Sequence, residues 1–330
     1  MQKPAAISTA FTRQFGIDFP IVSAPMFLVS NTDMVVATGE AGGLGTFPAL
    51  NYRPPANYKR ALEEIRSRTK APFGVNIIVQ KSNKFQHEHL DISLAAKVPL
   101  LITSLGSPRE VIRRAHEVGT KVYCDVIGLE HAKKVADLGA DGLIAVGAGA
   151  GGHAGDTSAF ALLPHLKRHV ELPLIAAGSI VDGIGMAGAL ALGADAVYMG
   201  TRFIASQECQ VDEAYKQAIL GADPEDIVST DRVDGFPGNF ILTESLKRVG
   251  LEPGFFEALL TRSARFKRGL SLLRAARALF GADKAGAKVS YKTIFSAGHG
   301  VALIDSIKSA EEIVHDTVRQ YREIVKGLPS

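Results

Sequence analysis

Eight short apolar runs constrain the fold of this chain more than any other feature. Each run is continuously apolar rather than alternating with polar residues, which is typical of parallel strands buried on both faces. Stretches with helical patterns separate the runs, and such alternation predicts a parallel sheet. The runs cover residues 20–25, 43–49, 73–79, 99–104, 121–126, 142–147, 173–178 and 196–201.

The helical stretches carry recognisable ends. Residues 31–42 open with Asn31 or Thr32 as N-cap, 107–119 open with Ser-Pro, and 182–194 have Asp182 as a candidate N-cap. Eight strand–helix units in about 200 residues predict an α/β fold of the (β/α)₈ TIM barrel type. A doubly wound open sheet is the alternative, but its six or so strands would leave two runs unexplained.

The alternation stops after residue 222. Residues 223–290 show no strand pattern and are predicted to form a helical substrate or lid lobe, with helices at 241–250 and 255–280, while 301–325 predict a closing amphipathic helix. We therefore divide the chain into a barrel of residues 1–222 and 291–330 and a lobe of residues 223–290. The lobe is basic, which indicates either solvated helix faces or a docking surface for a phosphate-bearing substrate. Its cations are Lys247, Arg248, Arg262, Arg265, Lys267, Arg268, Arg274 and Arg277.

Composition excludes several partners. The net charge of +3 over 330 residues gives no case for nucleic acid or a membrane surface. The sequence holds no run of about 18 apolar residues that could span a bilayer, and its first residues lack a signal core. Cys124 and Cys209 indicate neither a disulfide framework nor a metal site. We expect a cytoplasmic protein without a metal ion.

Two loops predict a phosphate site. Barrels often bind phosphate in the loops after strands 7 and 8, where backbone N–H groups suffice. The first of these loops offers open N–H groups at Gly178 and Ser179 plus a hydroxyl, and the second offers the same at Gly200 and Thr201. Two tight turns without a ligand are the alternative.

A glycine-rich stretch follows the sixth run. Residues 142–156 lead through Gly151 and Gly152 to His153. Glycine lets the backbone approach a ligand closely, and histidine exchanges protons near neutral pH. A structural histidine in a turn is the alternative, but its place at the catalytic face of the barrel favours His153 as the catalytic residue.

Other strand ends add polar candidates. Asn76 must find hydrogen-bond partners inside an apolar run, from the backbone or from a planar polar ligand on the barrel axis. Asp125 is placed similarly, either in a buried pair or facing outward, and Cys124 is predicted to be an inert buried thiol. The first strand ends at Ala24, Pro25 and Met26.

Five segments together resemble one family. Residues 20–30, 72–76, 150–156, 176–203 and 296–300 are similar to the nitronate monooxygenase family, which includes FMN-dependent enoyl-ACP reductase II and NADH:quinone reductases. The resemblance implies FMN across the barrel mouth and His153 as the active-site histidine. It implies a cofactor site formed by Ala24, Pro25, Met26, Asn76, Asp125, Gly151, Gly152, Gly178, Ser179, Gly200, Thr201, Ser296 and Gly298.

The chain departs from the family at two places. Several relatives carry His-Lys where this chain has Cys124 and Asp125, and many carry glutamine where it has His299. An acid near the flavin, in place of a base, would disfavour an anionic reduced flavin.

By this resemblance the expected reaction is oxidation of small-molecule alkyl nitronates with FMN and O₂ to a carbonyl compound and nitrite. His153 would hold the nitronate oxygens as imidazolium or remove the α-proton of a nitroalkane. One alternative is an NAD(P)H-dependent reductase of a CoA or ACP enoyl thioester, or of a quinone. Another is a non-enzymatic phosphate-binding barrel. The sequence leaves open whether the chain forms a homodimer.

Overall fold

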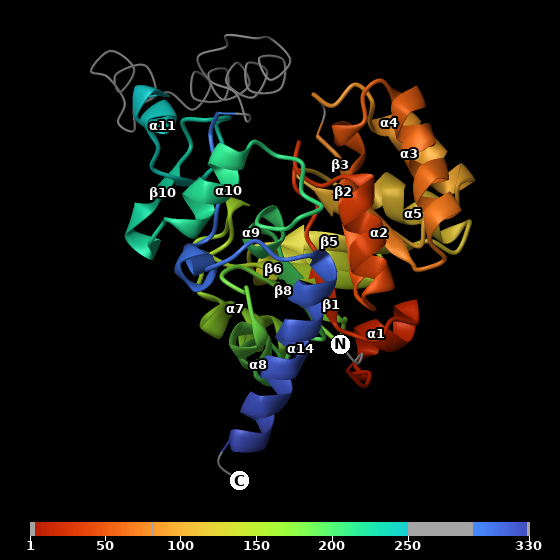
Figure 1. Cartoon of the computed structure of the whole chain (residues 1–330). Coiled ribbons are helices and arrows are strands. Elements are labelled where there is room, and N and C mark those ends of the chain that lie inside the picture. The colour runs from red at the N-terminus through yellow and green to blue at the C-terminus, as the bar shows by residue number, and fades with distance from the viewer. Residues whose placement is uncertain (1–3, 81, 250–292, 329–330) are drawn as a thin grey trace.

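The computed structural model describes residues 4–80, 82–249 and 293–328. Eight parallel strands form a closed barrel in chain order, and β9 pairs back onto β1. Figure 1 shows barrel strands at the centre of the molecule with helices around them. Each apolar run supplies one strand, so the predicted TIM barrel is confirmed. The strands are β1 (Ile21–Ser23), β2 (Leu44–Pro48), β3 (Phe73–Ile78), β4 (Leu100–Ser104), β5 (Lys121–Val126), β6 (Gly142–Val146), β8 (Leu174–Ala177) and β9 (Ala196–Met199).

Helices surround the barrel, and the long α14 packs against α8 and α2. Among the described residues, no helix combines the length and the apolar character needed to cross a bilayer. The helices are α1 (Ala10–Phe15), α2 (Thr32–Glu40), α3 (Pro55–Arg68), α4 (Gln86–Ala95), α5 (Arg109–His116), α6 (Leu129–Asp137), α7 (Ala159–Lys167), α8 (Gly183–Ala191), α9 (Thr201–Ile204), α10 (Glu213–Leu220), α11 (Glu244–Val249) and α14 (Ala310–Gly327), with 3₁₀ turns η1 (Ala49–Asn51), η2 (Pro224–Asp226) and η3 (His299–Leu303).

The helix ends confirm two predictions and correct two. Asn31 caps α2 and Asp182 caps α8 through their side chains. Helix α5 instead has Pro108 as N-cap, without a side-chain hydrogen bond. The closing helix begins at Ala310 rather than at residue 301, because Ser309 forms a capping box with Glu312 and the residues before it form η3 and a loop.

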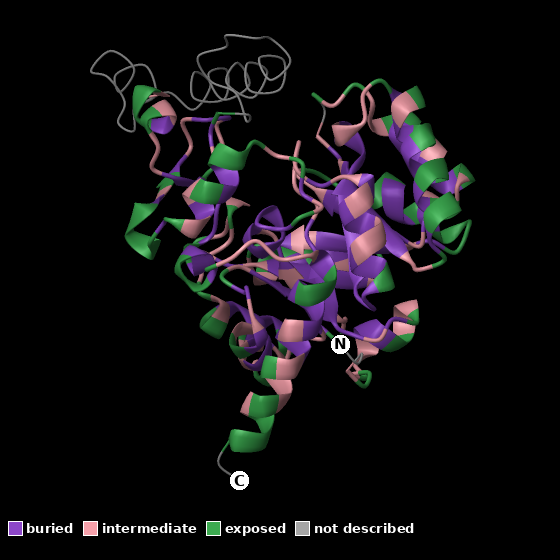
Figure 2. Cartoon of the chain, in the orientation of Figure 1, coloured by how far each residue is buried: buried purple, intermediate pink, exposed green. Residues whose placement is uncertain are grey.

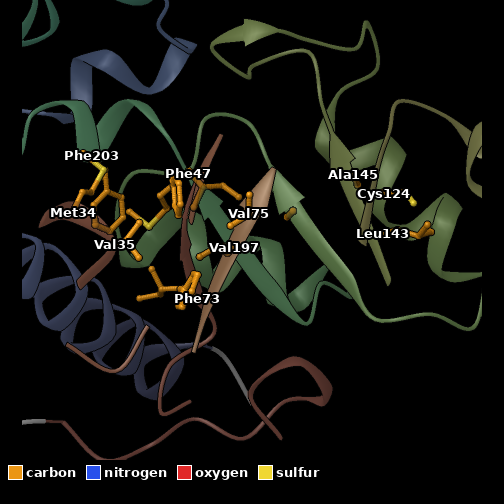
Figure 3. Close-up of a cluster of buried hydrophobic side chains, with 14 of the residues drawn as sticks. Met34, Val35, Phe47, Phe73, Val75, Cys124, Leu143, Ala145, Val197 and Phe203 are labelled. Carbon is orange, nitrogen blue, oxygen red and sulfur yellow. The ribbon is translucent and has the colours of Figure 1, made fainter. Parts of the chain in front are cut away.

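The pleat of the strands divides the core into two layers. In β5, Val122, Cys124 and Val126 point to the layer between barrel and helices, whereas Tyr123 points into the barrel. Figure 3 shows part of the outer layer, including Phe47, Val75 and Cys124, and Figure 2 shows that the barrel strands are mostly buried. Asp125 therefore faces the barrel interior rather than outward.

Helix α1 closes the amino end of the barrel. Phe11 and Phe15 pack on Tyr123, with ring centroids 5.8 and 6.0 Å away. The Tyr123 hydroxyl donates to the Gln14 Oε1 at 2.6 Å. The opposite end, where the strands finish, is thus the end that can admit a ligand.

The prediction that residues 223–290 contain no strand is wrong. Strands β10 (Ile227–Thr230) and β11 (Gly238–Ile241) form an antiparallel sheet with β7 (Gly152–His153). Both β10 and β11 are short and lie beside Gly, Asp and Pro residues, so the sequence shows only a weak strand pattern there. Pairing within the three-stranded sheet stabilises both strands. Helix α11 confirms part of the helix expected at 241–250. The helix expected at 255–280 and the lobe cations from Arg262 onward lie outside the described residues.

Candidate active site

One cavity of about 530 Å³ opens at the carboxyl ends of the barrel strands. It collects side chains and backbone from the ends of all eight barrel strands and from the small sheet. All the residues predicted to bind the cofactor, together with His153, line this cavity: Ala24, Pro25, Met26, Asn76, Asp125, Gly151, Gly152, Gly178, Ser179, Gly200, Thr201, Ser296 and Gly298. The structure thus brings the predicted residues to one place.

His153 lies on β7 with a carboxylate partner that the sequence did not reveal. Its Nε2 is 2.6 Å from the Asp234 Oδ2, and the two side chains are 40% and 7% exposed. The imidazole also packs edge-on against the Phe236 ring, with centroids 5.6 Å apart. Asp234 and Phe236 come from the connection between β10 and β11, so the small sheet carries both the histidine and its supports.

The glycine-rich loop is held by the Asn239 side chain and by close packing against the backbone of residues 297–298. The Asn239 amide, on β11, donates to the carbonyls of Ala148 and Ala150 at 2.8 and 2.7 Å. A Cβ on Gly151 would come within 2.7 Å of the Ala297 backbone, and one on Gly298 within 2.4 Å of the Gly149 oxygen. The absence of side chains therefore lets the two loops pack backbone to backbone.

The two loops predicted to bind phosphate offer fewer free hydrogen-bond donors than expected. The Ser179 N–H and hydroxyl both donate to the Gly149 oxygen at 3.2 Å, so these donors are engaged within the protein rather than open. The Thr201 hydroxyl accepts from the Gly298 N–H at 3.0 Å. At Gly200, a Cβ would meet nothing closer than 3.7 Å, which leaves room for a ligand beside Met26.

A polar chain crosses the floor of the cavity. The Asn76 amide donates to the Ser104 hydroxyl at 2.7 Å, and this hydroxyl donates to the Asp125 Oδ2 at 2.5 Å. The Asp125 Oδ1 is buried and has no hydrogen-bond partner among the described residues. Burial raises the pKa of Asp125 to about 6, although the Ser104 hydrogen bond and the His153 charge oppose the rise.

We expect Asp125→Asn to change how stability depends on pH. The folded state holds the Asp125 proton more tightly than the unfolded state, so this carboxyl destabilises the fold increasingly as pH rises from about 4 to about 6. Relative to wild type, the asparagine variant should gain up to about 3 kcal/mol between pH 4 and pH 8. Urea unfolding of the protein without added cofactor, at both pH values, measures this gain.

Asp141 serves as a control of opposite sign. Burial opposes ionisation there, but hydrogen bonds from Lys121, the Val122 N–H and His116 hold the pKa of Asp141 below its ordinary value. Asp141→Asn should therefore lose stability toward neutral pH relative to wild type. An equal stability difference between Asp125→Asn and wild type at pH 4 and pH 8 would contradict the assignment for Asp125.

Cys124 and His299 do not line the cavity. Burial raises the pKa of Cys124 to about 12, as expected of an inert thiol. His299 is exposed and does not line the cavity, although its neighbours Gly298 and Gly300 do. Among the described residues, no cluster of three His, Cys, Asp or Glu side chains could hold a metal ion.

Aromatic and cationic residues line another part of the cavity wall. The Arg53 guanidinium lies 5.6 Å from the centre of the Phe27 ring, and the Lys84 Nζ lies 5.1 Å from that of Phe85. Both pairs line the same cavity as His153. Among the lobe cations that the structure describes, Lys247 pairs with Glu244 on an exposed helix face, as expected of a solvated helix.

Comparison with known proteins agrees with the site. The model of the nitronate monooxygenase family matches residues 8–320. The structure of FabK from Thermotoga maritima is 33% identical, with a TM-score of 0.81, and the match covers 97% of this chain and 98% of that one. The fold, the cavity and these matches thus define an oxidoreductase built on a TIM barrel. The chain belongs to the nitronate monooxygenase family.

Two curated relatives carry different names. A protein of Rhodococcus jostii (strain RHA1), named (3aS,4S,5R,7aS)-5-hydroxy-7a-methyl-1-oxo-octahydro-1H-indene-4-carboxyl-CoA dehydrogenase, is 33% identical over 266 residues, which are 80% of this chain and 74% of that protein. The nitronate monooxygenase of Paraburkholderia phytofirmans (strain DSM 17436 / LMG 22146 / PsJN) is 28% identical over 359 aligned positions, covering 95% of each chain. Family membership therefore establishes an oxidoreductase and leaves its substrate to the site.

Proposed function

We propose that this chain binds FMN at the barrel mouth and oxidises small nitroalkanes, through their nitronates, to a carbonyl compound and nitrite with O₂. The observation that carries the proposal is the His153 imidazole, which lines the cavity and is supported by the buried Asp234. A histidine so placed can take a proton from a carbon acid, and nitroalkanes are carbon acids.

The residues of the cavity fit FMN. An isoalloxazine edge carries both N–H donors and carbonyl acceptors, and the cavity floor presents the Asn76 amide and the unpartnered Asp125 Oδ1. Space beside Gly200 and the start of α9 at Thr201 suit a phosphate, which backbone N–H groups at a helix start can bind. When bound, FMN supplies the electron acceptor that these side chains lack.

The chain's own residues bind and orient the substrate. The His153 imidazole takes the α-proton and, once charged, holds the nitronate oxygens close by. Asp234 stabilises this positive charge from the buried side. Phe236 and Phe240 line the cavity near the small sheet and exclude water from that side. The apolar wall favours a short alkyl chain.

The test is a spectrum followed by two assays. The purified chain, reconstituted with FMN, should show flavin absorption bands and release nitrite from nitroethane or its nitronate in air. Anaerobic NADH should leave the flavin colour unchanged. A colourless chain that does not take up FMN, or a flavoprotein that releases no nitrite, would contradict the proposal.

A second candidate is oxidoreduction of an acyl thioester of CoA or ACP with NAD(P)H. Two observations favour it: the Rhodococcus relative is named for a carboxyl-CoA substrate, and Arg53 and Lys84 bring cationic groups to the cavity wall. Rapid bleaching of the flavin by NADH, with reoxidation by an enoyl thioester and no nitrite from nitroethane, is the outcome that selects it.

A further inference from the structure

Asp234 divides its two oxygens between different donors. Its Oδ1 accepts the Phe236 N–H at 3.0 Å, and its Oδ2 lies 2.6 Å from the His153 Nε2. A carboxylate can only accept hydrogen bonds, so the proton of the neutral imidazole resides on Nε2. The orientation of the pair thus determines the tautomer of His153.

The other ring nitrogen is left for a ligand. Within residues 4–80, 82–249 and 293–328, no hydrogen bond engages the His153 Nδ1. The ring is 40% exposed, and His153 lines the cavity. With its proton on Nε2, the imidazole carries its basic lone pair on Nδ1.

The small sheet restricts the ring to this orientation. His153 pairs with Gly238 of β11, so its backbone is held in the sheet. Phe236 covers the ring edge-on at an interplanar angle of 80°. The Asn239 amide, also on β11, binds the loop that leads into β7. The supports of His153 therefore all come from the segment that connects β10 to β11 and from β11 itself.

We propose that Asp234 is a positioning residue that holds His153 in the Nε2–H tautomer, so that Nδ1 is the atom that accepts the substrate proton. This inference rests on the proposed function for the identity of the proton donor, a nitroalkane. The tautomer itself is independent of any substrate. In the proton transfer the substrate C–H bond breaks, its electron pair delocalises onto the nitro group, and the proton forms an N–H bond at Nδ1.

Asp234→Asn tests the inference because the site constrains how the amide sits. The Phe236 N–H requires an acceptor, so the amide oxygen should remain at the Oδ1 position and the NH₂ group should face His153. An amide N–H that donates to Nε2 forces the imidazole proton onto Nδ1. The base is then blocked while every side chain stays in place.

The experiment uses the FMN-loaded, full-length protein with ¹⁵N-labelled histidine. We expect an Nε2-protonated His153 in wild type and an Nδ1-protonated His153 in Asp234→Asn, with the signal assigned by its loss in His153→Gln. Turnover of nitroethane should fall roughly 100- to 10,000-fold in Asp234→Asn, and FMN affinity should be unchanged. Asp234→Glu, which retains a carboxylate, should keep the wild-type tautomer and recover part of the turnover.

Asp226→Asn is the matched control. Asp226 is exposed at the end of η2, directly before β10, and its side chain accepts only from the Asp223 N–H among the described residues. That variant should keep the tautomer and the turnover of wild type. An Nδ1-protonated His153 in wild type, or the same tautomer in wild type and Asp234→Asn, would overturn the inference. Full turnover in His153→Gln would instead contradict the proposed function, whatever the tautomer.

Discussion

His153→Gln is expected to lower nitroalkane turnover by about 100- to 10,000-fold, the usual contribution of a general base. Glutamine suits this test because its amide can still donate to the buried Asp234, so the variant removes the base and keeps a donor at the Asp234 Oδ2. The backbone pairing of β7 with β11 is retained. FMN should therefore bind as in wild type, and steady-state nitrite release measures the loss.

The matched control is His165→Gln. His165 lies exposed on α7 and does not line the cavity. Its replacement should leave turnover within experimental error of wild type. If His153→Gln turned over nitroethane as fast as this control, His153 would not be the catalytic base.

Gly298→Ala is expected to disrupt the site by a different route. The added Cβ would lie 2.4 Å from the Gly149 oxygen and 3.1 Å from the Gly151 N, and both are backbone atoms. One of the two loops must then move, at a cost of about 1–3 kcal/mol for overpacking. Because these loops line the proposed cofactor site, FMN affinity should fall at least tenfold. Urea unfolding and flavin fluorescence titration measure the two effects.

Gly188→Ala is the control, because it replaces a glycine at a position where the added Cβ has room. Gly188 lies within α8, where a Cβ would meet nothing within 4 Å. Alanine there should stabilise the protein by up to about 1 kcal/mol through helix propensity and leave FMN binding intact. Wild-type stability and FMN affinity in Gly298→Ala would show that the loops are not packed as described.

Much of the site could be predicted because barrel strands place their last residues at one end. Asn76, Asp125 and His153 line one cavity for this reason, once the strands are counted correctly. Whether the hydrogen-bond donors of the loops are free for a ligand could not be predicted in the same way. Ser179 looked open in the sequence, yet both its N–H and its hydroxyl bind the Gly149 oxygen, because the loops after β6 and β8 pack together.

The small sheet marks the limit of local patterns. Residues 227–230 and 238–241 are too short, and their neighbours too polar, for the sequence pattern to predict strands. They form strands by pairing with each other and with β7. The segment interpreted as a separate helical lobe therefore begins with part of the candidate active site.

The sequence by itself determined the barrel, the order of its strands and the position of His153, because apolar runs, glycines and turn residues act on neighbours along the chain. Only the tertiary structure decided that Asp234, 81 residues further on, supports His153 and that Ser104 supports Asp125. Such pairs are set by which strands and loops meet in space. No local pattern encodes that meeting, since each partner alone is an ordinary polar residue in a loop or at a strand end.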